Sequence, residues 1–249
     1  NVVSGMFSVN TEGSFHNTGR IEATDIDIHA NQIHNAGKLL FAHERLNLRG
    51  LGQESTLDNQ GGVLFSYGDM AIDVGRWLAK DGSLLAGKHA HLNVGSIEGD
   101  GRFLAGQDLR ITGTSPLNFG PQSLLDAGHT WVSAPALTNL GRVYGDRVTI
   151  ATPTLTQRGV MASRGRLDLG VGTLTQGAQG VLFSGQAMAM GGSVTPEGQA
   201  TAEASLIENQ GGLIESLGSL SIRTARIRNT NARLETQEVP AGEVTHDFW

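Results

Sequence analysis

The sequence predicts an all-β fold, a parallel β-helix of about ten coils with roughly twenty residues each. A motif that recurs along the chain, apolar residues that alternate within each repeat, and an excess of glycine carry this prediction. Glycine supplies 35 of the 249 residues, about twice the usual share near 7%. Charged residues make up 17%, below the usual ~25%. This composition suits many short strands joined by tight corners.

The recurring motif places an Asn, a Gly and an apolar residue close together. It is clearest at Asn17-Thr18-Gly19, Asn35-Ala36-Gly37, Asn59-Gln60-Gly61 and Asn209-Gln210-Gly211. Anchored on the first apolar residue of each copy, the repeats begin at residues 21, 39, 63, 84, 103, 124, 143, 160, 181 and 213. Such self-similarity at a nearly constant period is typical of solenoid proteins.

Each repeat contains three apolar pulses. The middle pulse is a pair two residues apart, as in Ile26/Ile28, Leu46/Leu48, Ile72/Val74, Leu92/Val94, Leu109/Ile111, Val148/Ile150, Leu167/Leu169, Met188/Met190 and Leu220/Ile222. Residues between these pairs, such as Thr149 and Asp168, are mostly polar and are expected to face water. A lone aliphatic residue, such as Ile33, Leu57 or Leu78, closes each repeat. Three short strands cannot enclose a core alone, but stacked copies can.

The corner residues have expected roles in this fold. Glycines at Gly19, Gly37, Gly61, Gly82, Gly101, Gly141, Gly159 and Gly211 are expected to supply backbone angles that a Cβ forbids. The Asn side chains before them are expected to hydrogen-bond from coil to coil, forming a ladder along the axis.

The repeats divide the chain into two parts. Residues 1–233 are expected to form the β-helix, with a loop insertion at 195–206 that interrupts one coil. Residues 234–249 abandon the pattern and are interpreted as a cap or the start of a following module.

Composition excludes several classes of function. The chain has no cysteine, which excludes disulfides, thiolate metal sites and a cysteine nucleophile. Its net charge of −6 makes nucleic acid an unfavourable partner. No run of 18 apolar residues is present, so no transmembrane segment is expected. The sequence indicates no cofactor.

Two acids and three histidines are the candidates for chemistry. Asp25 and Asp27 lie two residues apart on one strand face, where paired carboxyls could act on a sugar. No basic residue was identified beside them, and solvated acids are the favoured interpretation. His89 and His91 also share a face, and His129 aligns with His89 two coils away. The aligned strands were expected to offer Asp73 and Arg110, which do not complete a metal site. No metal site and no catalytic residue is therefore predicted.

The aromatic residues divide into two groups. Phe41, Phe65 and Phe103 fall in the first pulse and are expected to stack in the core. The remaining aromatics of interest are either buried at strand ends, which is favoured, or exposed platforms for sugar rings; they are Tyr67, Trp77, Trp131 and Tyr144.

The pattern N-x-G-x-[IL]-x-[AS]-x(3–8)-L-x-[IL] resembles the filamentous haemagglutinin repeat over about residues 17–233. The resemblance implies a right-handed parallel β-helix in a large exoprotein of the two-partner secretion pathway. It also implies an outer-membrane β-barrel transporter as partner, and a location outside a Gram-negative cell, at its surface. Adhesins and contact-dependent growth-inhibition (CdiA-type) proteins share this repeat.

Three functions follow, in order of preference. The first is a structural rod that presents a receptor-binding or toxin module to target cells and is itself not an enzyme. The second is an adhesive module that contacts a cell-surface protein or glycan through its lateral face, the 195–206 loop or the tail. The third is a carbohydrate-active β-helix. The sequence identifies neither the binding residues nor the receptor on the target cell.

Overall fold

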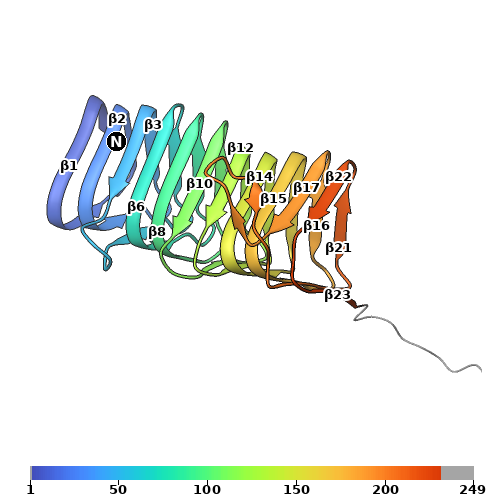
Figure 1. The fold of residues 1–249 in the computed structure, drawn as a ribbon. Helices are drawn as coiled ribbons and strands as arrows, with labels where there is room; N and C mark the ends of the chain where they lie inside the picture. The colour runs from blue at the N-terminus through green and yellow to red at the C-terminus, as the bar shows by residue number, and fades with distance from the viewer. Residues whose placement is uncertain (1, 231–249) are drawn as a thin grey trace, which may run out of the picture.

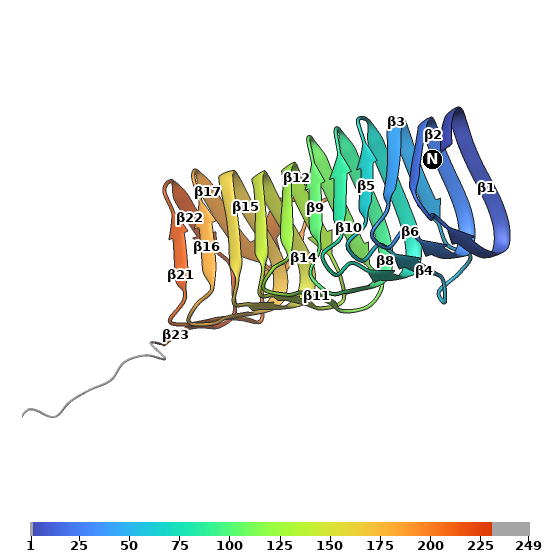
Figure 2. The same ribbon diagram turned by 180° about the vertical axis from the view of Figure 1, so that it is seen from behind.

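Parallel pairing joins each coil of the chain to the next. The computed structural model describes residues 2–230, and the predicted tail at 234–249 lies outside them. The coils stack into an elongated rod, with β1 at one end and β21, β22 and β23 at the other (Figures 1 and 2). About eleven turns of roughly twenty residues are present, and residues 2–230 contain no helix. The predicted all-β parallel solenoid is confirmed, and its right-handed sense stays a prediction.

Each coil supplies up to three strands. The first coils are single long strands, β1 (Val2–His16) and β2 (Arg20–His34). The middle coils comprise β3 (Leu39–Arg49), β4 (Thr56–Asp58), β5 (Val63–Ser66), β6 (Asp69–Leu78), β7 (Ser83–Ala86), β8 (His89–Glu98), β9 (Arg102–Ala105), β10 (Asp108–Gly113), β11 (Leu117–Phe119), β12 (Leu124–Ser133) and β13 (Leu137–Asn139). The later coils comprise β14 (Arg142–Gln157), β15 (Val160–Gln176), β16 (Val181–Ser184), β17 (Ala187–Gly191), β20 (Leu206–Gln210), β21 (Leu213–Ser216), β22 (Ser219–Ile222) and β23 (Ile227–Thr230).

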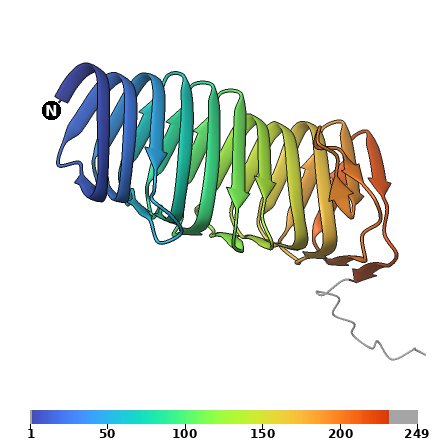
Figure 3. The ribbon, with the colours of Figure 1, turned by 60° about the vertical axis from the view of Figure 1, so that its left-hand side comes forward.

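One small sheet departs from the parallel stack. Strands β18 (Ser193–Val194) and β19 (Ala200–Thr201) pair antiparallel and form a hairpin between β17 and β20. In Figure 3 the coils run side by side along the rod. No helix long and apolar enough to cross a membrane occurs within residues 2–230.

The core is a set of side-chain ladders along the axis. In the first pulse the inward residues are Ile21, Leu40, Leu64, Leu84, Phe103, Leu125, Val143, Met161, Leu182 and Ile214, each paired with the next. The predicted anchors at 39, 63, 124, 160, 181 and 213 are therefore one residue early. Two adjacent apolar residues open those repeats, and a shift of one residue exchanges the two faces of a strand.

This shift changes the place of two phenylalanines. Phe41 and Phe65 lie on the outer face, half-buried, with ring centroids 5.0 Å apart. The prediction that they stack in the core is wrong. Phe103 is buried as predicted, and its ring meets that of Trp77 edge to face at 5.2 Å.

The other two pulses also differ from the prediction in places. The residues aligned with Leu46/Leu48 are Met70/Ile72 and Ala90/Leu92, which lie two residues before the predicted pairs Ile72/Val74 and Leu92/Val94. In the middle pulse Thr130 occupies an inward position between Leu109 and Val148, where its hydroxyl donates to the Tyr144 carbonyl at 2.6 Å. In the last pulse Trp77, and not Leu78, pairs with Leu57 and faces the core. The polar Thr130 is tolerated because its one donor is satisfied.

Asparagine side chains connect successive coils, as predicted. The Asn17 amide donates to Asn35 Oδ1 at 2.7 Å, and the Asn35 amide donates to Asn59 Oδ1 at 2.8 Å. A second group continues at Asn139, which donates to Gln157 Oε1 at 2.9 Å. These amides are buried, where an unpaired polar group would cost about 1–3 kcal/mol.

The corner glycines mostly serve close packing. Among the predicted positions, Gly37, Gly61 and Gly211 have positive φ, and Asp81 adopts the same conformation with φ of 56°. The remaining predicted corners gain no such freedom. At Gly82 a Cβ would lie 2.2 Å from the Asn59 carbonyl oxygen. Glycine is thus required there because the preceding coil occupies the space.

The register yields a stability prediction. Leu64→Ala removes a fully buried side chain and is expected to lower the unfolding free energy by about 2–5 kcal/mol. Val63→Ala, one residue earlier on the outer face, is expected to cost under about 1 kcal/mol. Urea denaturation of both variants measures this difference, and equal losses would contradict the assigned register.

Candidate binding site

The hairpin formed by β18 and β19 folds back on the side of the rod. Its turn is closed by the Thr195 amide, which donates to the Gln199 carbonyl at 2.9 Å, and by the Gly198 amide, which donates to the Thr195 carbonyl at 2.8 Å. The hairpin overlaps the insertion predicted at 195–206. It reaches coils whose residues lie about fifty positions earlier in the chain.

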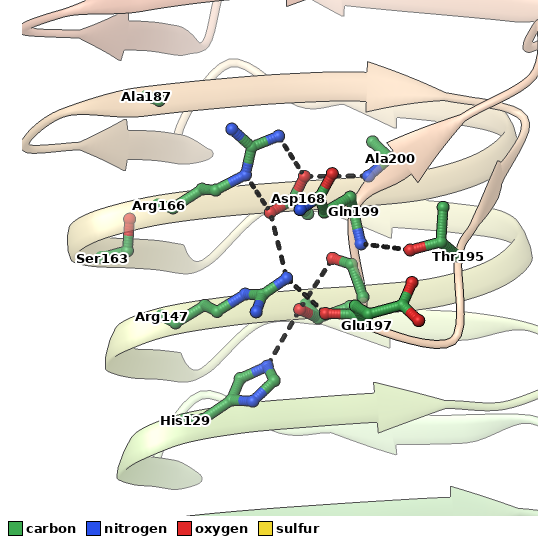
Figure 4. A network of polar contacts seen from close by, with 12 residues as sticks. His129, Arg147, Ser163, Arg166, Asp168, Ala187, Thr195, Glu197, Gln199 and Ala200 are labelled. Atoms are coloured by element: carbon green, nitrogen blue, oxygen red, sulfur yellow. Dashed lines mark hydrogen bonds and ion pairs between the residues drawn. The ribbon is translucent and has the colours of Figure 1, made fainter.

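A buried carboxylate anchors the hairpin. The Asp168 side chain is 0% exposed and accepts hydrogen bonds from Arg166 Nε at 2.7 Å and Arg166 Nη2 at 2.8 Å. It also accepts the backbone N–H of Ala200 at 2.8 Å, as Figure 4 shows. Arg147 donates to the Glu197 carbonyl oxygen at 2.5 Å and lies 4.0 Å from Asp168. A charge with this many partners can remain buried.

The sequence prediction for Asp168 was wrong. Asp168 and Thr149 lie on the outer face of the middle strands, as their positions between apolar pairs predicted, yet both are buried. The hairpin covers them. The hydrogen bond with Asp168 also raises the pKa of the Arg166 guanidinium.

The hairpin tip packs over Trp131. The Gly198 carbonyl oxygen accepts from the Thr149 hydroxyl at 3.3 Å. A Cβ at Gly198 would lie 2.7 Å from Trp131 Cζ3, and the φ of Gly198 is +79°. Glycine is therefore needed here for space and for conformation together.

A groove of about 320 Å³ opens beside the tip. It spans four coils and the hairpin, and its lining residues are His91, Asp108, Leu109, Arg110, His129, Trp131, Arg147, Pro196 and Glu197. The Arg110 guanidinium lies over the Trp131 ring, 4.4 Å from the centroid. We call this cavity the hairpin groove. It combines cationic, acidic and aromatic groups, a mixture typical of polar ligand sites.

The groove wall contains N–H donors without acceptors. Trp131 Nε1 and Arg147 Nε are both buried and neither has a hydrogen-bond partner. A buried donor without an acceptor costs about 1–3 kcal/mol, so such groups are uncommon in folded proteins. Of the four buried polar side-chain atoms without a hydrogen-bond partner among the described residues, two belong to residues that line this groove.

His129 lies between the groove and the rod surface. Burial lowers the pKa of His129, and the positive charge of Arg147 lowers it further, while Asp108 acts in the opposite direction. His129 Nε2 lies 3.0 Å from the Thr149 hydroxyl. The imidazole is therefore held neutral more readily than a free histidine.

The structure revises the surroundings of the histidine pair. His89 and His91 share a face, with Ala90 and Leu92 buried behind them, as predicted. Register places Asp108 between His89 and His129, and His89 Nδ1 lies 2.7 Å from Asp108 Oδ2. Arg110 pairs with His91 as expected, whereas Asp73 pairs with Asn93, two residues beyond the pair of Ala71 with His91, so that expected neighbour was wrong. Within the described coils, no three His, Asp or Glu side chains are grouped to hold a metal.

The paired acids have basic neighbours that the sequence did not reveal. Arg45, from the next coil, contacts Asp25 with Nε–Oδ1 at 2.9 Å, and His29 lies 3.2 Å from Asp27. The hydrogen bond from Arg45 lowers the pKa of the Asp25 carboxyl. The lowered pKa makes Asp25 unsuited to be the protonated carboxyl that glycoside hydrolysis needs beside an ionised one.

The four remaining aromatics divide evenly. Trp77 and Trp131 are buried, at 1% and 9% exposure. Tyr67 is 60% exposed and packs edge to face on Phe65, with ring centroids 4.9 Å apart. Tyr144 is half-buried on the outer face. Burial thus holds for the tryptophans, and the tyrosines lie at the surface.

Sequence reasoning did not bring the groove residues together. Coil register places Arg110 beside Trp131 and Arg147 beside His129, and the fold-back of the hairpin adds Glu197 to them. The one available signal was an insertion, combined with an aromatic residue at a position that the repeat assigns to the outer face.

Two curated proteins are similar to this chain. The deoxyribonuclease CdiA of Dickeya dadantii is 28% identical over 171 residues, which cover 66% of this chain and 5% of that protein. The tRNA nuclease CdiA of Escherichia coli is 28% identical over 225 residues, which cover 84% of this chain and 7% of that protein. Both relatives are CdiA proteins. Neither a protein-family model nor a solved structure matches the chain.

The sequence resemblance left adhesins and CdiA-type proteins as alternatives, and these two relatives favour the CdiA type. The chain is a β-helical segment that is similar to CdiA proteins, and it spans 5% and 7% of the lengths of these two relatives. The filamentous haemagglutinin repeat itself has no matching family model.

The expectation that the protein is not an enzyme is wrong on these comparisons, because both relatives are named as nucleases. That expectation was based on the side chains of this segment alone, whereas the nuclease names describe whole proteins. The match covers only 5% and 7% of the two relatives, so the side chains of this segment cannot decide what the whole protein catalyses.

The fit of the hairpin tip can be tested at Gly198. Gly198→Ala is expected to push the tip off Trp131 and to lower the hydrogen-exchange protection of the Ala200 amide by about tenfold or more. Gly52→Ala is the matched control, because Gly52 has φ of +100° but no atom within 4 Å of an added Cβ. Unchanged protection of Ala200 in the Gly198 variant would contradict the packing.

The environment of His129 predicts a pH dependence. Its folded-state pKa lies below the unfolded value, so its contribution to stability is present above about pH 6.5 and is lost as pH falls from there through the folded pKa. NMR titration is expected to show the depressed pKa, and Arg147→Gln to raise it. Arg164→Gln, at an arginine 81% exposed, is expected to leave it unchanged. Equal effects of the two substitutions would exclude Arg147 as a cause.

Proposed function

We propose that this chain is a rod segment of a large CdiA-like exoprotein and that it helps present a receptor-binding or toxin module to a target cell. The observation that carries the proposal is the unbroken inter-coil pairing from β1 to β23. In such a stack each coil contacts only its neighbours, so the rod can extend over a long distance without a partner bound along its sides. The similarity to two CdiA proteins supports the same assignment.

The last described coil also suits a longer rod. Leu213, Leu217, Leu220 and Ile227 are 46–66% exposed there, although the aligned positions of earlier coils lie under a following turn. An added coil would cover these side chains and pair the open strand edges, which otherwise favour association.

The remaining expectations extend this proposal to the whole protein. We propose secretion through an outer-membrane β-barrel transporter and display at the surface of a Gram-negative cell. The relatives' names give them DNA and tRNA as substrates, and we propose a nuclease activity of this kind for the full-length protein. The charge argument against nucleic acid concerns these 249 residues alone.

A whole-coil deletion in the full-length protein tests the rod function. Removing residues 84–102 joins Ser83 to Phe103, and Ser83 then takes the place of its register partner Arg102. The rod shortens by about 4.8 Å, and target-cell inhibition or adhesion is expected to persist. Removing residues 84–93 breaks the register and is expected to abolish it. Loss of function in the whole-coil deletion, with the β spectrum intact, would show that this segment acts through specific contacts.

A second candidate function is adhesive binding through the lateral face, which the unsatisfied donors of the hairpin groove favour. Replacing the hairpin by a short link between Gly191 and Ala204 is expected to abolish cell binding while the β spectrum persists. Unchanged binding would remove the hairpin from consideration.

A further inference from the structure

We infer that the hairpin groove binds a carboxylated saccharide, a glycan unit that carries an acid group beside its hydroxyls. The inference rests on the second proposed function and names the ligand class of that lateral face. The chemistry of the groove wall supports it in three respects: unsatisfied donors, a free guanidinium, and acceptors placed among them.

The unsatisfied donors favour a ligand that carries many oxygen acceptors. Trp131 Nε1 and Arg147 Nε have no acceptor, and Trp131 is only 9% exposed. Both residues line the groove. Because these groups can only donate, an acceptor oxygen would complete them, and another cation would not. Both atoms are enclosed by protein, so an oxygen in the groove reaches them only after a local shift of the surrounding side chains.

Arg110 supplies the charge for a carboxylate. The central carbon of its guanidinium lies over the Trp131 ring, 4.4 Å from the centroid, and this cation–π contact restrains the side chain. Within residues 2–230 no carboxylate oxygen lies within 4.0 Å of Arg110. A planar, preorganised guanidinium without an ion-pair partner suits a bidentate carboxylate.

Acceptors among the donors favour a saccharide over a simple anion. Asp108 and Glu197 also line the groove. Their carboxylates can only accept hydrogen bonds, so they favour a ligand that carries hydroxyl donors in addition to its own carboxylate. An acidic peptide fits less well. The strands at the groove are already paired on both sides, as β10 is with β8 and β12, so no strand edge is free to bind a peptide backbone.

The shape fits a chain that lies along the rod. The hairpin groove has about 320 Å³, near the lower limit of roughly 300 Å³ for ligand pockets. A second cavity of about 360 Å³ shares His91 and Asp108 with it and continues toward Arg45. One acidic unit at Arg110 could therefore be followed by further sugar units in the adjoining cavity.

Calorimetry at low salt tests the inference with two acidic probes, trigalacturonate and sialyllactose. At least one is expected to bind with a dissociation constant below about 1 mM. The methyl ester of trigalacturonate and lactose are the neutral counterparts and are expected not to bind. This comparison uses the unmodified protein and depends on no variant.

Substitution at Arg110 locates the site. Arg110→Gln is expected to weaken binding about tenfold or more, and Arg110→Lys to weaken it too, because lysine lacks the planar fork. Arg102→Gln is the matched control, since Arg102 is an exposed arginine on the outer face of β9 and does not line the groove. Circular dichroism checks that each variant is folded.

Several outcomes would overturn the inference. They are no binding of either acid, equal binding of acid and ester, equal losses in the Arg110 and Arg102 variants, or equal binding of hexaglutamate, which would indicate an acidic peptide. If cell binding depends on the hairpin but neither saccharide binds, the ligand class fails and the adhesive function stands. If the hairpin has no effect on cells while the saccharide binds, the adhesive function fails alone.

Discussion

The fold depends on backbone hydrogen bonds between successive coils. Strands of adjacent coils lie about 4.8 Å apart, and this distance decides which residues the corners accept. At Gly82 and Gly159 the carbonyl oxygen of the preceding coil lies about where a Cβ would stand, 2.2 and 2.1 Å from it. At Asn35 the same spacing lets one amide reach the next. Glycine and asparagine thus suit the short distance between coils for two different reasons. Glycine has no Cβ to clash with the preceding coil, and asparagine hydrogen-bonds to it.

The same spacing places like residues next to each other on the outside of the rod. Along one ladder the basic residues Arg45 and His89 alternate with the acidic residues Asp69 and Asp108. The alternation ends after Asp108, because His129 pairs with Arg147 and Arg147 pairs with Arg166. Like charges opposite each other are destabilising, and Asp168 lies within reach of both. The hairpin covers Asp168. The Arg147–Arg166 pair, the buried Asp168 between them and the inserted hairpin therefore form a single structural unit.

The sequence predicts most of the fold because each repeat reports the same geometry. Agreement among many copies identifies the parallel solenoid, the core pairs such as Ile26/Ile28 and the asparagine ladder. It does not resolve single-residue register where two apolar residues adjoin, as at Leu39-Leu40, because both satisfy the pattern and only packing against neighbouring coils selects one. Phe41 and Phe65 were misplaced for this reason.

The candidate site could not be predicted in the same way, and the reason lies in the repeat itself. Equivalent coils produce equivalent surfaces, so a rod built only of repeats offers no position that differs from the next. A specific site requires a break in this equivalence. Here the break is the hairpin, whose contacts to Arg147 and Thr149 span 50 and 49 residues of sequence and whose contact to Trp131 spans more. No periodicity encodes such contacts, because the insertion occurs once. In a solenoid of this kind, the segment that departs from the repeat is therefore where a binding site is most readily formed, while the repeats fix its position along the rod.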